Sequence, residues 1–348
     1  MVLNFNKLLL YSTFVRCYIT EESYIKKMLG LGKKLIATIA IVLLIPFVPQ
    51  CAYAQVDSAY VGSFGQKYSV QTFFGSNFTG LLQVLDNDDE TMYMPNAPFS
   101  IGLGLSWGKS SIGFGYGFPF MRDPKKGKTK TNMFSFQYHY YGRKFIADIF
   151  FQDYKGLYTE DEGKDEVYHF FPDIRVTQYG ALWQYVFNGK KMSYRAAYNQ
   201  TERQLRSAGS FLLGGGATYN ILKAQTSLDL NEKNTINNIQ LGINGGYGYT
   251  WVINSRVYVS GSLSLGVNIG TEYMDNFALK NIKAYPSVYP RIGFGYNHDS
   301  WSLRLSAINN LNHIAYTKQE KLSFMTGNIQ LTFIKRFGDI PILSKYLE

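Results

Sequence analysis

The chain is short of three things: charge, cysteine and long apolar runs. Only 17% of its 348 residues are Asp, Glu, Lys or Arg, whereas soluble domains carry about 25%. The mean hydropathy is −0.15, and the repeated runs of ~20 apolar residues that membrane helices need are missing. These scarcities exclude a helical multi-span membrane protein, and an ordinary soluble domain fits poorly.

The single long apolar run, 35–48 (LIATIAIVLLIPFV), follows Lys33 and Lys34 and precedes Ala52-Tyr53-Ala54. A basic region, an apolar region of this length and a small-x-small site form a secretory signal peptide. We therefore predict a leader over residues 1–54 with cleavage after Ala54. An N-terminal membrane anchor is the alternative, and the run is short for one.

Both cysteines, Cys17 and Cys51, lie in this leader. The mature chain is therefore expected to lack disulfides, thiol chemistry and cysteine-ligated metals. The second methionine, Met28, gives the leader ordinary dimensions, so we expect translation to start there. Residues 55–67 are predicted to be a short N-terminal segment, 68–337 the folded domain and 338–348 a tail.

Apolar and small polar residues alternate along most of the mature chain. In 239–253, for example, Ile239, Leu241, Ile243, Tyr247 and Trp251 share one face, and Gly, Asn, Gln and Thr share the other. A period of two is the signal of a β-strand. The polar face carries few charges and the apolar face is rich in aromatic residues, which indicates strands facing lipid outside and a polar lumen inside.

Short polar turns alternate with long polar loops. The turns are 108–110, 142–144, 188–190, 254–256 and 298–300, and the loops are 86–97, 119–130, 159–174, 225–237 and 271–283. This alternation is typical of outer-membrane barrels, which have short periplasmic turns and long external loops. The sequence therefore predicts an all-β, transmembrane, antiparallel up-and-down β-barrel.

Thirteen segments read as strands: 68–84, 98–107, 111–119, 131–142, 145–158, 175–187, 191–203, 208–223, 238–253, 256–270, 284–297, 301–313 and 323–337. Bacterial barrels have even numbers, so one assignment is wrong. We suspect 199–216, which is too charged at its start and too rich in glycine later. The prediction is twelve strands, with fourteen as the alternative.

Five charged residues fall on the polar, lumen-facing side of the predicted strands: Asp148, Arg195, Arg291, Arg304 and Arg336. A lumen is where a barrel tolerates charge at membrane depth. The arginines predict either a constriction that prefers anions or an interior plug in which they pair with Asp148 and Glu202. The plug is favoured, since a twelve-stranded lumen is narrow enough for side chains to fill.

Other chemistry is weakly indicated. Gly108-Lys109-Ser110 lacks the preceding glycine of a phosphate loop. Ser207 or Ser210 could pair with His169 or His313 at a membrane rim, but no spacing requires it. The acidic segment 86–90 (DNDDE) lacks the glycine of a calcium loop. We expect no catalytic residues, no metal site and no cofactor.

Four stretches resemble a known family: YSVQTFFG (68–75), QYHYYGRKF (137–145), the segment 185–215 and YGYTWVINSRVYVSGSL (247–263). They are similar to an uncharacterised family, domain of unknown function 4421, of Bacteroidota outer-membrane proteins. The resemblance covers the mature chain and implies an outer-membrane β-barrel. It implies no activity and no site residues.

These observations favour a passive channel or transporter for small solutes in the outer membrane of a Gram-negative-type cell. The alternatives are a membrane-embedded lipid or glycolipid hydrolase and a non-conducting structural or adhesin barrel. The expected partners are outer-membrane lipid, an unidentified small solute and the barrel-insertion machinery, because 328–337 (NIQLTFIKRF) ends on an aromatic residue. Nucleic acid is not expected: much of the +10 net charge lies in the leader, turns and loops.

Overall fold

The structure, a computed structural model, describes residues 56–85, 89–96, 99–123, 130–160, 167–225, 234–271, 282–316 and 320–338. The predicted leader, most of the acidic segment 86–90 and the tail from 339 onward lie outside these residues. So do the side chains of 77–79, 85, 310–316 and 320–321, and hence that of His313.

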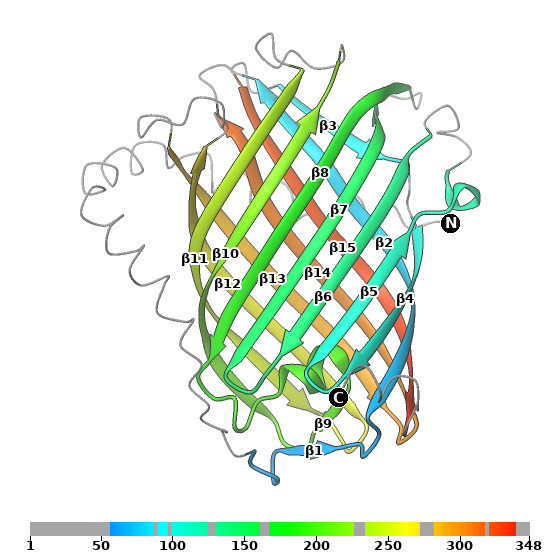
Figure 1. Cartoon of the computed structure of the whole chain (residues 1–348), viewed down its shortest axis with the longest axis vertical. Coiled ribbons are helices and arrows are strands. Elements are labelled where there is room, and N and C mark those ends of the chain that lie inside the picture. Colours follow the sequence, from blue (N-terminus) through cyan, green and yellow to red (C-terminus); the bar gives the residue numbers. More distant parts are fainter. Residues whose placement is uncertain are drawn as a thin grey trace. The chain divides into compact units, whose positions relative to one another are not determined.

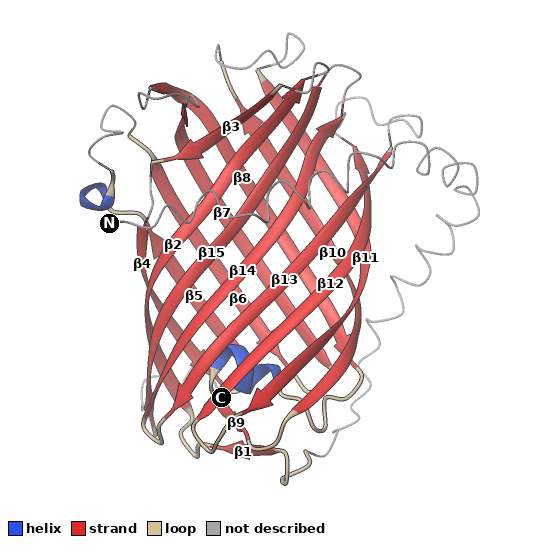
Figure 2. Cartoon of the chain, turned by 180° about the vertical axis from the view of Figure 1, so that it is seen from behind, coloured by secondary structure: helices blue, strands red, loops and turns tan. Residues whose placement is uncertain are grey.

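The described chain is almost entirely β-strand (Figures 1 and 2). The long strands are β2 (Tyr68–Leu85), β4 (Phe99–Trp107), β5 (Ser110–Tyr116), β6 (Asn132–Tyr141), β7 (Phe145–Glu160), β8 (Tyr168–Val186), β10 (Ala208–Lys223), β11 (Thr235–Val252), β12 (Val257–Thr271), β13 (Lys283–Asn297), β14 (Trp301–Tyr316) and β15 (Glu320–Phe337). The short elements are β1 (Val61–Ser63), β3 (Glu90–Pro95), β9 (Glu202–Gln204) and the helical turns η3 (Pro119–Met121) and η5 (Arg195–Asn199).

Twelve strands form a closed antiparallel ring. Closure comes from β15 against β2, in register from Tyr68↔Phe337 to Leu85↔Glu320. The predicted barrel and its number of strands are therefore confirmed. β3 is additional: Tyr93 pairs with Leu81 of β2 and Met94 with Tyr158 of β7, so β3 joins β2 to β7 beyond the shorter strands β4, β5 and β6.

Three predicted boundaries are corrected. The strand expected at 191–203 does not exist, because residues 187–207 leave the wall and the middle of this segment, 192–200, packs inside the ring. The loop expected at 86–97 contains β3, and most of the loop expected at 159–174 is strand. The alternating pattern fades toward the external ends of β7 and β8, where apolar residues also face inward; Leu157, for example, is buried.

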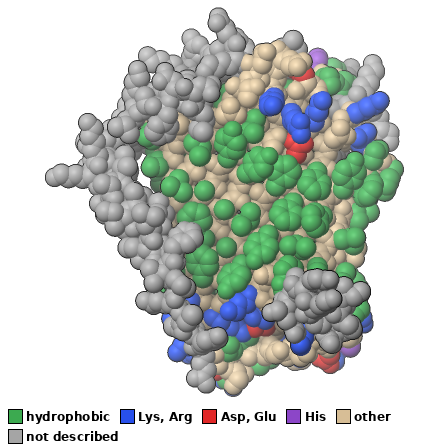
Figure 3. All heavy atoms as spheres, in the orientation of Figure 1, with side chains coloured by type: hydrophobic (Ala, Val, Ile, Leu, Met, Phe, Trp, Pro, Cys, Tyr) green, Lys and Arg blue, Asp and Glu red, His purple; other side chains and the backbone are tan. Residues whose placement is uncertain are grey.

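The outside of the ring is apolar. Leu103, Leu213 and Ile292 are each more than half exposed, and Figure 3 shows hydrophobic side chains spread as a belt over the wall. Such a belt is the lipid-facing surface of a transmembrane barrel. None of the helices in the described part of the chain is long and apolar enough to cross a membrane.

Two glycines of the inner face lie against aromatic rings of neighbouring strands. A Cβ on Gly102 would lie 1.8 Å from the Phe73 ring, and one on Gly180 would lie 2.1 Å from the Phe150 ring. Rings from one strand thus occupy the space that a side chain would take at glycines of other strands. Only glycine permits this approach, and the result is a lumen filled by side chains.

Candidate functional site

An insert between β8 and β10, residues 187–207, enters the ring at the end with the short turns. Figure 2 shows its helical turn, η5, inside the wall. The small side chains of Ala196 and Ala197 and the ring of Tyr198 are buried. η5 stops at Gln200, whose φ of 50° is in the left-handed region. We call residues 187–207 the plug.

Hydrogen bonds fasten the plug to the wall. The Tyr258 hydroxyl of β12 donates to the Ala197 carbonyl oxygen at 2.9 Å. The Gln200 side-chain amide donates to Oδ1 of Asn297 on β13 at 2.9 Å. The Arg336 guanidinium of β15 donates to the Gln200 carbonyl oxygen at 2.8 and 3.1 Å. Most of these bonds are buried, and a buried polar group needs its partner, so the plug has one preferred position.

Glu202 is the charged centre of the plug. It accepts from the Ser193 hydroxyl at 2.7 Å, pairs with Arg195 at 3.2 Å and pairs with Arg143 from the turn between β6 and β7. Arg195 was expected on a wall strand and instead lies in η5. Burial lowers the pKa of its guanidinium, Glu202 opposes that shift and Arg143 adds to it.

A second set of charged residues crosses the lumen beside the plug. Nη2 of Arg291 on β13 lies 2.8 Å from Oδ2 of Asp148 on β7. Oδ1 of the same carboxylate lies 2.5 Å from Nδ1 of His139 and accepts from the Tyr141 hydroxyl at 2.8 Å. The Tyr141 ring contacts the Tyr194 ring of the plug, with centroids 6.0 Å apart. Plug and ion pair therefore form one packed layer.

Arg304 of β14 differs from the other predicted arginines. Its side chain is buried, at 7% exposure, and its one described partner is the Thr332 hydroxyl at 3.4 Å. Nε and Nη1 have no hydrogen-bond acceptor. Among the described residues Arg304 has no ion pair, so it is a buried cation with donors to spare.

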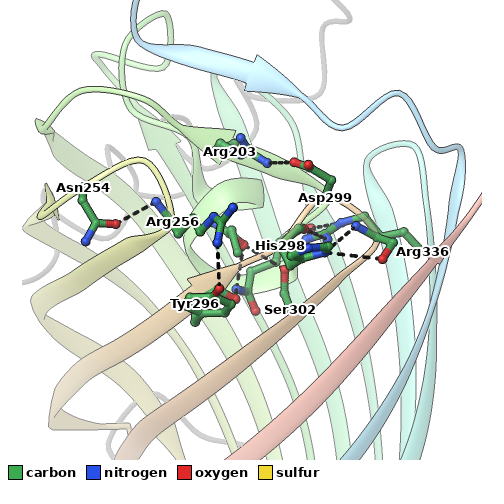
Figure 4. Close-up of polar contacts among 11 residues, drawn as sticks. Arg203, Asn254, Arg256, Tyr296, His298, Asp299, Ser302 and Arg336 are labelled. Carbon is green, nitrogen blue, oxygen red and sulfur yellow. Dashed lines mark hydrogen bonds and ion pairs between the residues drawn. The ribbon is translucent and has the colours of Figure 1, made fainter.

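Arg336, the fifth predicted residue, helps to hold an N-terminal latch, residues 56–64. β1 of this segment pairs with β9 of the plug from Val61↔Gln204 to Ser63↔Glu202. The Arg336 guanidinium lies 3.5 Å from the centroid of the Phe64 ring. Arg203 of β9 in turn pairs with Asp299 in the turn before β14, at 2.7 Å (Figure 4).

Apolar side chains fill the inside of the ring toward the opposite end. This outer cluster comprises Leu81, Tyr93, Met133, Tyr154, Leu157, Ile174, Val176, Leu222, Ala224, Leu322 and Phe324. Its members come from β2, β3, β6, β7, β8, β10 and β15, with Ala224 directly after β10, and all are buried. The described lumen is thus packed by polar groups at one end and by apolar groups at the other.

The rim serines are not placed with His169. The Ser207 hydroxyl accepts from the Val252 amide and the Ser210 hydroxyl from the Asn188 amide, both at the short-turn end. His169 lies at the start of β8, at the opposite end of that strand. The described residues contain no group of three or more metal-binding side chains.

The residues missed by the sequence analysis are those of the plug and its contacts, above all Gln200, Arg143 and His139. Their signal was indirect, namely the odd strand count and the charge in 199–206. The sequence analysis favoured an interior plug in which arginines pair with Asp148 and Glu202, and the structure has the pairs Arg291–Asp148 and Arg195–Glu202. Arg195 lies in η5 and not on a wall strand.

A closed ring of antiparallel strands, an apolar exterior and a packed interior define a transmembrane β-barrel with an internal plug. The chain belongs to the family described as Domain of unknown function (DUF4421), which it matches over residues 55–337. No curated protein matches the chain.

Several solved structures match the chain at low sequence identity. The toluene transporter TodX of P. putida is 8% identical with a TM-score of 0.31, and the match covers 79% of this chain and 91% of TodX. The toluene transporter TbuX of Ralstonia pickettii is 10% identical with a TM-score of 0.29, covering 78% and 90%. OmpT of Vibrio cholerae is 8% identical with a TM-score of 0.29, covering 77% and 98%.

Proposed function

We propose that this barrel is a transporter for small solutes whose lumen is closed at rest by the plug. The observation that supports the proposal is that the middle of the plug, 192–200, packs inside the ring while both neighbouring strands, β8 and β10, pair directly with each other from Leu212↔Val186 to Lys223↔Arg175. The wall is therefore complete without the plug. A segment that the wall does not need is suited to move.

The bonds that hold the plug are individually modest. A hydrogen bond contributes about 0.5–1.5 kcal/mol net, and the contact of Arg203 with Asp299 is exposed to solvent and weak. Lids and gates are drawn from the less stable parts of a protein. The plug fits that description better than the strands, whose ladders run the length of the wall.

Arg304 supports a preference for solutes with a negative charge. A buried guanidinium with two unsatisfied donor atoms favours an acceptor that brings its own charge, such as a carboxylate or phosphate. Asp148 and Glu202 are already occupied by Arg291 and by Arg195 with Arg143. Arg304 thus remains available to a passing anion.

The corresponding location is the outer membrane of a Gram-negative-type cell, reached through the predicted signal peptide. We infer a source among the Bacteroidota, which the resemblance noted in the sequence supports. Cell fractionation tests the location: the mature chain should begin at Gln55 and sediment with outer-membrane markers. Recovery in the soluble periplasm would contradict it.

Removal of the plug tests the function. Replacing residues 189–206 by Asn-Gly leaves a five-residue loop, Asn-Gly followed by 207–209, between Asn188 and Ser210 in the observed register, which is a common length for a hairpin connection. In planar bilayers the wild type should be closed for most of the time, and this variant should show steady single-channel current. A variant that forms a barrel but passes no current would contradict the proposal.

The outer cluster favours a second candidate, a non-conducting structural barrel, because its apolar side chains are packed against one another. The same recordings distinguish the two functions. A structural barrel predicts no current with or without the plug.

A further inference from the structure

Three cations align on the outside of the barrel, across three neighbouring strands. Lys155 of β7 pairs in register with Arg175 of β8, which pairs with Lys223 of β10. All three side chains are exposed. Neighbouring strands lie about 4.8 Å apart, so the row is roughly 10 Å wide. We call these residues the basic row.

The basic row stands at the edge of the lipid-facing belt. Ten residues nearer the short-turn end, the same strands carry a second register row, Phe145, Tyr185 and Leu213, which are also exposed. Ten residues at about 3.3 Å, tilted by ~40°, rise roughly 25 Å. That is the height of the apolar band of an outer-membrane barrel. One row therefore lies at each membrane interface.

The surface between the two rows is suited to acyl chains. Phe151, Tyr179 and Tyr219 form a row of rings in contact, with centroids 4.9 and 6.2 Å apart; the first pair is tilted and the second is stacked. The one charged outward residue between the rows on these three strands is Asp153. Figure 3 shows Lys and Arg side chains gathered directly above the hydrophobic belt on this side of the wall.

Asp153 orients the guanidinium of Arg175, the central residue of the basic row. Its carboxylate accepts from Nε and Nη2 of Arg175 at 2.8 and 2.9 Å. Among the described residues, Lys155 and Lys223 form no ion pair. The row therefore holds an oriented guanidinium between two ammonium groups, an arrangement that suits phosphate oxygens.

The wall changes just beyond the row. Gly156, with φ of +85°, interrupts the register of β7 directly after Lys155. The pairing of β6 with β7 also ends at Asn132↔Lys155. Such irregularities sit at barrel rims. The long loops mark this rim as the external one, and so the basic row faces the head groups of the outer leaflet.

We propose that the basic row binds the phosphate of an outer-leaflet lipid, with the acyl chains lying on the aromatic row of Phe151, Tyr179 and Tyr219. The occupant is a phosphorylated glycolipid of the kind that forms the outer leaflet of Gram-negative-type membranes. The site is on the lipid side of the wall and acts independently of any solute in the lumen.

Native mass spectrometry with a defined probe tests the site. The mature barrel in detergent is mixed with monophosphoryl lipid A or with the same lipid after removal of its phosphate. The wild type should retain the phosphorylated probe at least roughly tenfold better. The variant K155Q/R175Q/K223Q should lose this preference. The control K109Q/K144Q/K190Q removes equal charge from exposed turns at the other end and should keep it.

Three results would overturn the proposal. They are unchanged retention by the triple variant, equal loss in the control, and displacement of the lipid by millimolar inorganic phosphate, which would indicate a site for the free ion. The single variants K155Q and K223E, each at an exposed position, give the same readout if the triple variant does not fold.

Discussion

Arg291 of β13 reaches across the lumen to Asp148 of β7, with Nη2 and Oδ2 2.8 Å apart. The two strands are five positions apart along one side of the ring and seven along the other. Both side chains are about nine-tenths buried. The pair is therefore a crossbar between distant walls, placed against the tyrosines of the plug.

Breaking the crossbar on one side should destabilise the barrel. Asp148→Asn leaves the Arg291 charge buried without its partner, which costs about 3–5 kcal/mol of unfolding free energy. Urea unfolding in lipid vesicles measures this. The double variant D148L/R291M should recover most of the loss, because apolar residues of similar size tolerate burial. A double variant that is no more stable than D148N would contradict the account.

The contact of the Phe150 ring with Gly180 gives a second prediction about the stability of the barrel. Gly180→Ala places a Cβ 2.1 Å from the Phe150 ring, and overpacking of this kind costs about 1–3 kcal/mol. Gly113→Ala is the control, because its Cβ would lie 3.8 Å from the Phe73 ring, an ordinary contact. In the Phe150→Ala background, Gly180→Ala should cost nothing. An equal cost in both backgrounds would show that the ring is not responsible.

Alternation with a period of two was enough to predict the barrel, the lipid-facing side and all twelve of its strands as separate elements near their observed positions, together with a thirteenth, 191–203, that does not exist. The odd count of thirteen segments indicated that one strand assignment was wrong, and we placed the error near 199–216. The function of the luminal glycines could not be predicted, because Phe73 and Gly102 meet across strands. Alternation determines which face each residue takes, and says little about which ring covers which glycine.

The contact between the plug and the turn before β14 should be sensitive to acid. Arg203 lowers the pKa of Asp299 through a hydrogen bond and its charge, so the contact stabilises the fold when the carboxylate is ionised. That contribution is complete above the unfolded pKa of about 3.9 and is lost as the pH falls through the lower folded pKa. Asp299→Asn should therefore be less stable than the wild type at pH 7, and the two should converge near pH 2–3.

The same comparison has a built-in control. Asp299 is fully exposed, so high salt should shrink the difference between the two proteins at pH 7. A difference that persists at low pH would mean that the Asn side chain, and not the lost charge, is responsible.

Arg304 should set the charge preference of the open barrel. In the variant that lacks residues 189–206, Arg304→Gln should lower the ratio of anion to cation permeability, measured from reversal potentials in a salt gradient. Lys223→Gln removes a charge from the lipid-facing side and should leave the ratio unchanged. Equal ratios in the Arg304 variant and its parent would remove Arg304 from solute selection.

The candidate site was predictable in its residue types and not in its geometry. The polar-face arginines and Asp148 follow from alternation alone. Pairing Arg291 with Asp148 requires knowing that β7 and β13 face each other, which depends on ring closure. The position of Arg195 depends on η5, and its segment has no pattern that distinguishes a luminal turn from a strand. The pairing of Arg291 with Asp148 and the position of Arg195 both depend on the closed barrel.

The central claim is that the plug closes the lumen and must move for solute to pass. The mature chain is expected to contain no cysteine, so a disulfide can be introduced between the plug and the wall. Positions 197 and 293 are the pair to test, because the two backbones are close: a Cβ on Gly293 would lie 3.9 Å from the Ala197 carbonyl oxygen. Each single cysteine variant serves as a control.

Single-channel recording of A197C/G293C before and after reduction tests this claim most directly. The account predicts that the oxidised barrel stays closed and that reduction in the same bilayer restores the openings of the wild type. Equal current in the oxidised and reduced states, with the disulfide verified by mass spectrometry, would contradict it.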